Sequence, residues 1–227
     1  MLSVELHAHS SLSYDGHDPV ELLLEQAAAI GLDALAVTDH DEIDASLRAA
    51  ELASEYDLIG IPAMEVSSAA GHVLGFGITE QVPAGLSYDE TVTRIRSQGG
   101  IAVVHHPFQS ARHGVAAEIA TAQLTAADAI EVYNSRLLTG RANRKAKKFA
   151  QTHDIAMTAG SDAHISEMVG QAVTEVATET QSVDGILNAI VAGETSVIGT
   201  KTPWRVSFKQ FSGGVKRRIM RTLSELV

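Results

Sequence analysis

Hydrophobic segments along much of the chain end in side chains of the types that bind metal ions. The first segment carries His7 and His9 on alternate residues, and alternate side chains of a strand point to the same face, so these two imidazoles can bind one cation. One such pair is more typical of structural histidines. The pattern recurs, however, and the residues that follow or flank later segments are Asp39, His40, Glu65, His72, His106, Asp162 and His164. This pattern favours a metal site, which needs a fold that brings these segment ends to one point.

Periodicity predicts alternating strands and helices. Helix signals run from Asp18-Pro19 to Gly31 and from Ser87, with Glu90 as its capping-box partner. The expected elements are helices 18–31, 42–56, 87–98, 139–151 and 182–192, and strands 58–61, 72–78, 101–104, 129–133, 155–159 and 195–198, with further strands at the N-terminus and before Thr38. This order predicts parallel strands with helices outside, in a closed barrel or an open doubly wound sheet. We favour the barrel, because a ring brings its strand ends together.

Length and composition fit one α/β domain with an oxygen- and nitrogen-based metal site. The chain has 227 residues, of which 45% are hydrophobic, so it can bury a substantial core. It has no cysteine, and metal ligands must come from imidazole and carboxylate groups. No run approaches about 20 apolar residues, and the first residues lack a charged region followed by an apolar one. We therefore expect a cytoplasmic protein without a membrane partner, and no obligate protein partner is evident.

Charge divides the chain into an acidic body and a basic tail. Residues 201–227 carry seven Lys or Arg and one acid, whereas residues 1–200 carry ten basic and 27 acidic residues. Apolar residues Val215, Ile219 and Leu223 recur at helical spacing in the tail. The favoured interpretation is a helix that packs on a catalytic domain of residues 1–200. The alternative is a basic arm that guides nucleic acid or an acidic partner.

The ordered motifs resemble those of the PHP (polymerase and histidinol phosphatase) family. They are His7-x-His9, Asp15-Gly16, Thr38-Asp39-His40, Glu65, His72, His106-Pro107 and Gly160-Ser161-Asp162-Ala163-His164. The resemblance covers about residues 2–200. It implies a distorted seven-stranded (β/α)7 TIM-like barrel that holds two or three divalent ions, usually Mn²⁺, Fe²⁺ or Zn²⁺, for phosphoester hydrolysis.

The resemblance also implies a ligand for each ion. His7, His9, Glu65 and Asp162 would bind the first ion, and Glu65, His72 and His106 the second. Asp15, His40 and His164 would bind the third. His106 is preferred to His105 because the family histidine immediately precedes proline. Glu65 would hold two ions around a shared water, and His164 or water on the third ion would protonate the leaving group, so the expected catalytic residues are Glu65, Asp162 and His164.

Four polar residues outside this set are candidate substrate ligands. They are Arg112, His113, Asn134 and Arg136, which follow the segments that end at His106 and Tyr133. Arginine binds phosphate with two parallel hydrogen bonds, although each residue could instead belong to a solvated loop.

The sequence leaves several substrates open. A small phosphomonoester, a nucleotide or a short oligonucleotide fits a site for terminal phosphate, and a histidinol-phosphate-type activity competes with these. Only a short segment separates Pro107 from Tyr133, which leaves little room for the helical lobe found in many nucleotide-specific relatives. A non-catalytic RNA-binding PHP scaffold is the alternative outside enzymes, but it predicts eroded ligands and a basic body.

Overall fold

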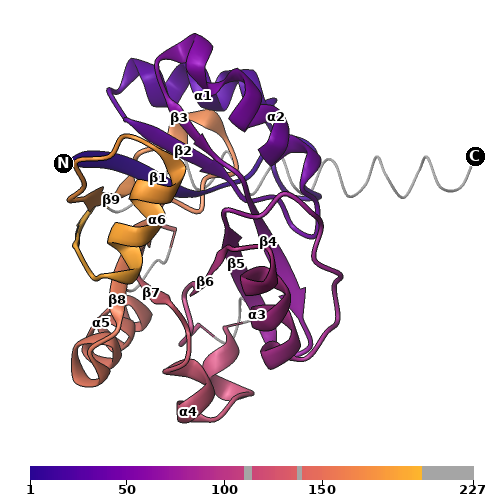
Figure 1. Cartoon of the computed structure of the whole chain (residues 1–227), viewed down its shortest axis with the longest axis vertical. Helices are drawn as coiled ribbons and strands as arrows, with labels where there is room; N and C mark the ends of the chain where they lie inside the picture. Colours follow the sequence, from indigo (N-terminus) through magenta and orange to yellow (C-terminus); the bar gives the residue numbers. More distant parts are fainter. Residues whose placement is uncertain (110–113, 137–139, 201–227) are drawn as a thin grey trace, which may run out of the picture.

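The computed structural model describes residues 1–109, 114–136 and 140–200, in which strands and helices alternate (Figure 1). The strands are β1 (Leu2–Ala8), β2 (Ala34–Val37), β3 (Ile59–Ile61), β4 (Ala63–Ser68), β5 (Gly71–Phe76), β6 (Ile101–Val104), β7 (Ala129–Asn134), β8 (Ala156–Gly160), β9 (Ala172–Val176) and β10 (Thr195–Gly199). The helices are α1 (Val20–Ala29), α2 (Asp44–Leu52), α3 (Tyr88–Ser97), α4 (Thr121–Leu124), α5 (Arg141–His153) and α6 (Val183–Val191). The basic tail and its proposed helix lie outside the described residues.

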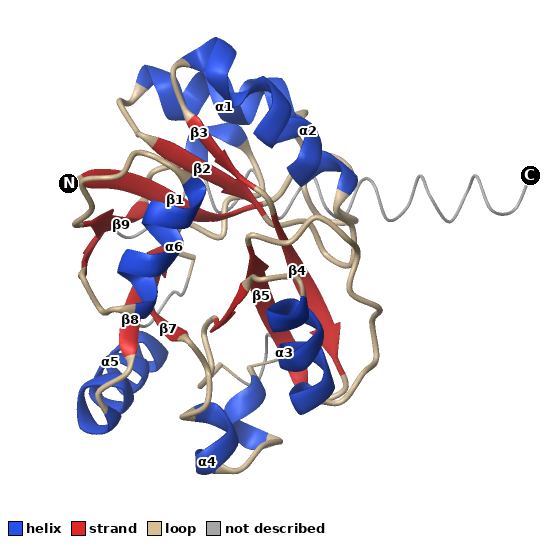
Figure 2. Ribbon diagram, in the orientation of Figure 1, coloured by secondary structure: helices blue, strands red, loops and turns tan. Residues whose placement is uncertain are grey.

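The strands form two sheets of five. The first has the order β10-β9-β1-β2-β3 and the second the order β4-β5-β6-β7-β8 (Figure 2). Pairs β1–β2, β2–β3, β6–β7 and β7–β8 are parallel, whereas β1–β9, β9–β10, β4–β5 and β5–β6 are antiparallel. The fold is therefore mixed α/β, and the expectation of parallel strands holds for only part of it.

The closed barrel predicted from the sequence is not found among the described residues. Their ladders leave two separate sheets, which are joined by two isolated parallel bridges, Ala8 to Ala163 and His40 to Glu65. Both bridges lie at or beside predicted metal ligands. The sheets thus approach each other where those ligands gather, which satisfies the requirement for convergence without a continuous ring of hydrogen bonds.

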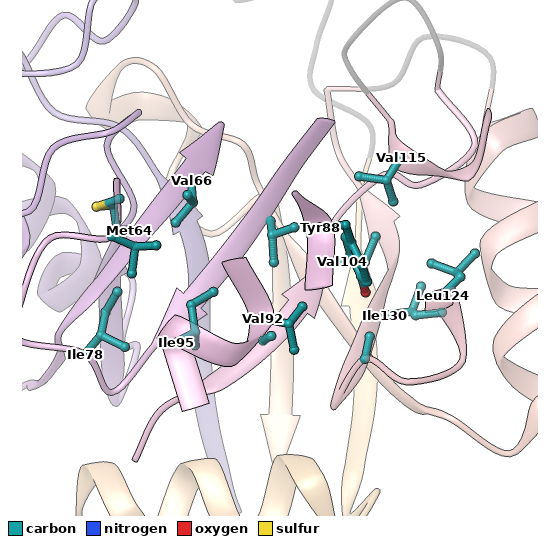
Figure 3. Packing of buried hydrophobic residues seen from close by; sticks show 14 of the residues in the cluster. Met64, Val66, Ile78, Tyr88, Val92, Ile95, Val104, Val115, Leu124 and Ile130 are labelled. Atoms are coloured by element: carbon teal, nitrogen blue, oxygen red, sulfur yellow. The ribbon is translucent and has the colours of Figure 1, made fainter. Parts of the chain in front are cut away.

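Helices cover the outer faces of both sheets and enclose the core. Helix α3 packs on β5 and β6, and its Val92 and Ile95 join a cluster with Met64 and Val104 (Figure 3). The start of α3 is set by the predicted capping box, in which Ser87 and Glu90 bond reciprocally to each other's backbone N–H groups. No helix in the described ranges is both long and apolar enough to cross a bilayer.

Two strands were missed by the sequence analysis. Strand β4 places Glu65 between apolar neighbours in the middle of its run, and β9 contains Thr174 and Glu175, so neither reads as a continuous apolar segment. Antiparallel pairing explains β9: it joins β1 without the crossover helix that the alternation had led us to expect.

Candidate metal centre

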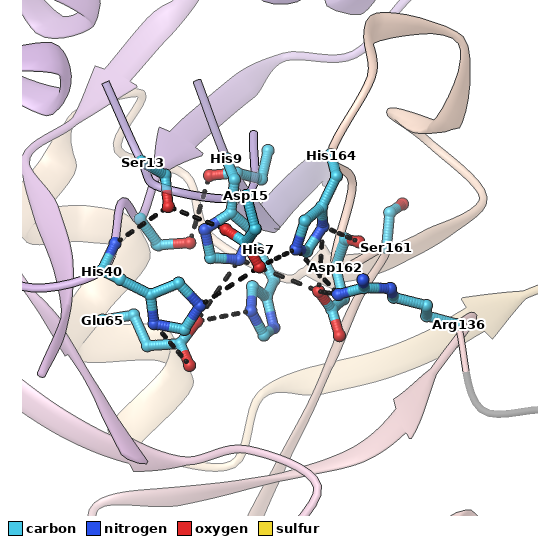
Figure 4. Close-up of polar contacts among 12 residues, drawn as sticks. His7, His9, Ser13, Asp15, His40, Glu65, Arg136, Ser161, Asp162 and His164 are labelled. Carbon is cyan, nitrogen blue, oxygen red and sulfur yellow. Dashed lines mark hydrogen bonds and ion pairs between the residues drawn. The ribbon is translucent and has the colours of Figure 1, made fainter. Parts of the chain in front are cut away.

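Histidines and carboxylates converge at one edge of the two sheets. β1 and the residues after it supply His7 and His9, the turn after β2 supplies His40, and β4 supplies Glu65 (Figure 4). Asp162 and His164 follow β8. The antiparallel direction of β5 brings His72, near its first residue, to the same edge, where it faces Ser67 of β4. The fold therefore brings together donors that are up to 157 positions apart in the sequence, from His7 to His164.

Glu65 lies at the middle of this cluster, and its two oxygens face different imidazoles. Oε2 lies 3.1 Å from His7 Nε2 and 3.3 Å from His9 Nε2. Oε1 lies 2.5 Å from His72 Nδ1 and 3.0 Å from His105 Nε2. The side chain is only 2% exposed. A carboxylate that presents one oxygen to each of two donor groups is suited to bridging two cations.

Several buried ring nitrogens have no hydrogen-bond partner among the described residues. Both nitrogens of His9 are in this state, as is one nitrogen each of His40, His105 and His106. Buried polar atoms are normally paired, because an unpaired one costs about 1–3 kcal/mol. A neutral imidazole has one ring nitrogen with a free lone pair, and a bound cation would satisfy it. Three compact groups in the described ranges could hold a cation: His7, His9 and Asp162; His7, Glu65 and His105; and His9, His40 and Glu65.

In the metal-free cluster, burial and neighbouring charges shift the pKa values of different side chains in opposite directions. Burial alone would raise the pKa of Glu65, but surrounding imidazoles, His105 foremost, hold that pKa well below its usual value. Burial opposes charging of His40, yet the carboxylates of Glu65 and Asp15 raise its pKa to about 9. Burial and the neighbouring His164 lower the pKa of His9 well below its usual value. A proton held on His40 thus partly offsets the charge of the carboxylates when no metal is bound. A bound metal ion would offset that charge instead.

A buried carboxylate outside the proposed ligand set holds two of the predicted donors in place. Glu131 of β7 accepts a hydrogen bond from His7 Nδ1 at 2.9 Å and one from the His106 amide at 3.2 Å. The bond fixes the tautomer of His7 and leaves Nε2 toward Glu65, as is common for histidine ligands. Glu131 was not among the site residues predicted from the sequence. One signal for it was a charged residue inside the apolar strand 129–133.

The backbone around the last motif is tightly constrained. Asp162 has a φ of 51°, in the left-handed region that non-glycine residues seldom adopt. A Cβ at Gly160 would lie 2.4 Å from the Cβ of His7 and 2.8 Å from a Glu131 oxygen. The glycine of Gly160-Ser161-Asp162-Ala163-His164 is therefore required by the close approach of β8 to β1.

His105, rather than His106, lies against Glu65. His105 is fully buried and belongs to one of the three compact donor groups. His106 has a φ of 28°, and its ring lies edge-on to that of His105 with centroids 4.0 Å apart. The sequence-based preference for His106 stays a prediction. The geometry favours His105, which alternation along the strand β6 aligns with the buried Val103.

The proposed ligands of the third ion are arranged differently. His164 Nε2 lies 2.7 Å from Asp15 Oδ2, and His40 Nε2 lies 3.6 Å from the same oxygen. Arg136 enters this region, with its NH1 nitrogen 3.0 Å from Asp162 Oδ1. Hydrogen bonds from His164 and His40 outweigh burial and lower the pKa of Asp15 well below its usual value. Asp15 is 26% exposed, so this side of the centre is the more open one.

Two polar residues beside the centre, Asn134 and Asp39, form hydrogen bonds with other groups of the protein. Asn134, proposed as a substrate ligand, is 1% exposed and donates to Glu131 Oε2 at 3.1 Å and Asp162 Oδ2 at 3.3 Å, so it supports the donors; its role in substrate binding stays a prediction. Asp39 accepts hydrogen bonds from the amide and hydroxyl of Ser10. Arg112 and His113 lie outside the described residues.

Comparisons with known proteins agree with this picture. The pattern of a family described as PHP-associated matches residues 140–195. An uncharacterised protein of Methanocaldococcus jannaschii is 32% identical over 175 residues, which span 75% of this chain and 69% of the relative.

Solved structures share the fold at lower identity. A two-domain protein of Bacteroides vulgatus containing a predicted PHP-like metal-dependent phosphoesterase aligns with a TM-score of 0.75 and 18% identity, over 93% of this chain and 69% of that one. The lesion-specific endonuclease Q of Pyrococcus furiosus aligns with a TM-score of 0.65 and 16% identity, over 86% of this chain and 57% of that one. Together with the ordered donors at the sheet edge, these matches show that the chain belongs to the PHP family.

Proposed function

We propose that the protein is a metal-dependent phosphoesterase that hydrolyses a terminal phosphate ester, with two or three divalent ions held by the buried histidines and carboxylates. The observation that carries this proposal is the pair of Glu65 oxygens, each of which faces its own imidazoles. The unpartnered ring of His9 supports it, because a metal ligand needs a lone pair that no protein group already occupies. Mn²⁺, Fe²⁺ and Zn²⁺ all accept such ligands.

The donor set fits phosphate chemistry. Divalent ions bound here would supply the Lewis acidity that makes water nucleophilic near neutral pH and would offset the charge on phosphate. Glu65 sets the spacing of the two donor groups, and Asp162 contributes an anionic oxygen 3.8 Å from His9 Nε2. Arg136, at the open side, can offer its guanidinium to a phosphate oxygen.

His164 is the candidate for protonating the leaving group. Its Nδ1 donates to the carbonyl oxygen of Asp162 at 2.9 Å, which fixes the ring. Nε2 remains as the atom that exchanges a proton with the ester oxygen. This role matches the sequence-based expectation, and it requires Nε2 to become accessible when substrate binds.

The substrate class that we propose is a nucleotide or short oligonucleotide phosphate. Endonuclease Q, a lesion-specific endonuclease, has a similar fold, which supports a nucleic-acid-derived substrate. At the mouth of the site, the ring of Tyr14 stacks on His40 with centroids 4.7 Å apart and is 65% exposed, so its outer face is available to a base. A histidinol-phosphate-type activity remains the competing enzyme class. A non-catalytic RNA-binding scaffold is disfavoured, because the donors are retained and buried.

A phosphate-release screen of metal-loaded protein tests the proposal. The substrates are nucleoside mono- and bisphosphates, short oligonucleotides and histidinol phosphate, each assayed with Mn²⁺, Fe²⁺ or Zn²⁺. We expect release from nucleotide or oligonucleotide substrates. Asp162→Asn, which removes the anionic ligand at constant size, should lower turnover by orders of magnitude and leave the fold intact. Failure of wild-type protein to bind any metal, or full activity of Asp162→Asn, would refute it.

A further inference from the structure

Arg136 lies where a metal ligand set would otherwise be completed. Its NH1 nitrogen is 3.0 Å from Asp162 Oδ1 and 2.7 Å from His164 Nε2, and Figure 4 shows the guanidinium between these two side chains. The side chain is 22% exposed and thus mostly enclosed. A guanidinium stays charged at all physiological pH values, so it brings a fixed positive charge to this position.

The atoms around Arg136 are arranged as if to receive a cation. His164 Nε2 lies 2.7 Å from Asp15 Oδ2 and 2.7 Å from NH1 of Arg136. Asp162 Oδ1 lies 3.0 Å from the same NH1. One imidazole nitrogen and two carboxylate oxygens, which are donor types that bind divalent ions, thus gather beside the positive charge of the guanidinium.

The three predicted ligands of the third ion do not surround this position together. Asp15, His40 and His164 do not form one of the compact donor groups found within the described ranges, all three of which consist of His7, His9, His40, Glu65, His105 and Asp162. His40 is drawn instead toward Glu65, with its Nδ1 3.4 Å from Oε1. Asp15 and His164 thus lie together here, and the positive charge beside them is the guanidinium of Arg136.

We propose that the guanidinium of Arg136 takes the place of the third metal ion, so that the protein holds two ions and not three while Arg136 contacts Asp162 and His164. This inference rests on the proposed function and narrows it. A third dication would lie beside the fixed charge of Arg136 and would have to displace it from both partners. Arg136 is then a positioning residue that sets the number of ions.

Metal stoichiometry tests the inference directly. Metal-free full-length protein is titrated with Mn²⁺ by calorimetry, and bound metal is counted by mass spectrometry after gel filtration. We expect two Mn²⁺ per chain for wild type and three for Arg136→Gln. Arg136→Met, uncharged and of similar length, is the second variant in case the glutamine variant does not fold, and it should also bind three.

Two further variants make the result specific. Arg96→Gln removes the same charge from an exposed pair with Asp128 outside the site and should leave two ions bound. Adding Asp15→Asn to Arg136→Gln should return the count from three to two, because Asp15 is the carboxylate of the third position. Three ions in wild type, or two in both uncharged Arg136 variants, would overturn the inference alone. No metal in wild type would overturn the proposed function with it.

Discussion

The inner and outer sides of the metal centre satisfy their donor atoms in different ways. On the inner side, His9, Glu65 and His105 are almost fully buried, and ring nitrogens of both histidines lack hydrogen-bond partners among the described residues. On the outer side, Asp15 and His164 already contact each other, and Arg136 contacts His164. The inner side needs a bound metal ion to pair its donor atoms. On the outer side, the guanidinium of Arg136 already supplies a positive charge. Loss of a donor should therefore affect the two sides unequally.

The largest effect is expected from Glu65→Gln, because this change removes the carboxylate that faces both imidazole groups. We expect loss of at least one bound ion and a fall in kcat/KM of roughly a thousandfold or more. The matched outer change, Asp15→Asn, should lower kcat/KM far less and leave two ions bound. Metal analysis and steady-state kinetics measure both. Equal losses in the two variants would remove the distinction between the sides.

The next effect separates His105 from His106. We expect His105→Ala to weaken binding of the most loosely held ion by about 10–100-fold or more, because His105 Nε2 lies 3.0 Å from Glu65 Oε1. His106→Ala should change affinity less and mainly lower stability. Competition titration with a metal-binding dye gives the affinities. The reverse order would restore the family-based assignment of His106 and place His105 behind it.

A smaller effect is expected from Gly160→Ala, which touches the inner side only through packing. The added methyl group would lie 2.4 Å from the Cβ of His7, and we expect a loss of roughly 1–3 kcal/mol in the free energy of unfolding. Gly193→Ala shows the other cost of replacing a glycine, because Gly193 has a positive φ and its added Cβ would meet nothing within 4 Å. Denaturant unfolding of the metal-free wild type and both variants measures the two costs. A Gly160 variant as stable as wild type would contradict the close approach.

The smallest predicted effect is a dependence of stability on pH at His40, which lies between the two sides. The pKa of His40 is raised from 6.5 to about 9 in the folded, metal-free protein, so the folded state retains a proton that the unfolded chain loses. This contribution is complete below pH 6.5 and is lost as the pH rises through 9. We expect the melting temperature of metal-free protein to fall by several degrees across this window and that of His40→Asn to fall less. Metal affinity should rise over the same range, since binding must displace the proton. A flat melting profile would argue against the raised pKa.

The sequence predicted much of this centre because strand ends and ligand types are both local signals. Strand 101–104 was placed at its observed bounds, and the capping box of Ser87 and Glu90 was identified from two residues. Antiparallel strands β4 and β9 were missed, because a partly polar strand shows its nature only through its pairing partner.

The contacts that distinguish one donor from its neighbour were beyond sequence reasoning. His105 and His106 are adjacent and chemically identical, and only the turn of the backbone at His106, with its positive φ, decides which ring faces Glu65. Arg136 was predicted to be a substrate ligand from its residue type and position, and that role stays a prediction. Its contact with His164 depends on how β7 and β8 lie side by side, which no local pattern encodes.

The division into two sheets has a consequence for how the chain folds. The second sheet is built from one continuous stretch, residues 63–160, whereas the first joins residues 2–61 to residues 172–199. Contacts between distant segments form slowly, so the first sheet should be completed only after residues 172–199 have been synthesised. The donors come from both sheets and run from His7 to His164, so the full set also depends on segments that are far apart in the sequence. A chain that ends before His164 would therefore lack part of the donor set, and metal binding at this centre would report that the two ends of the domain have met.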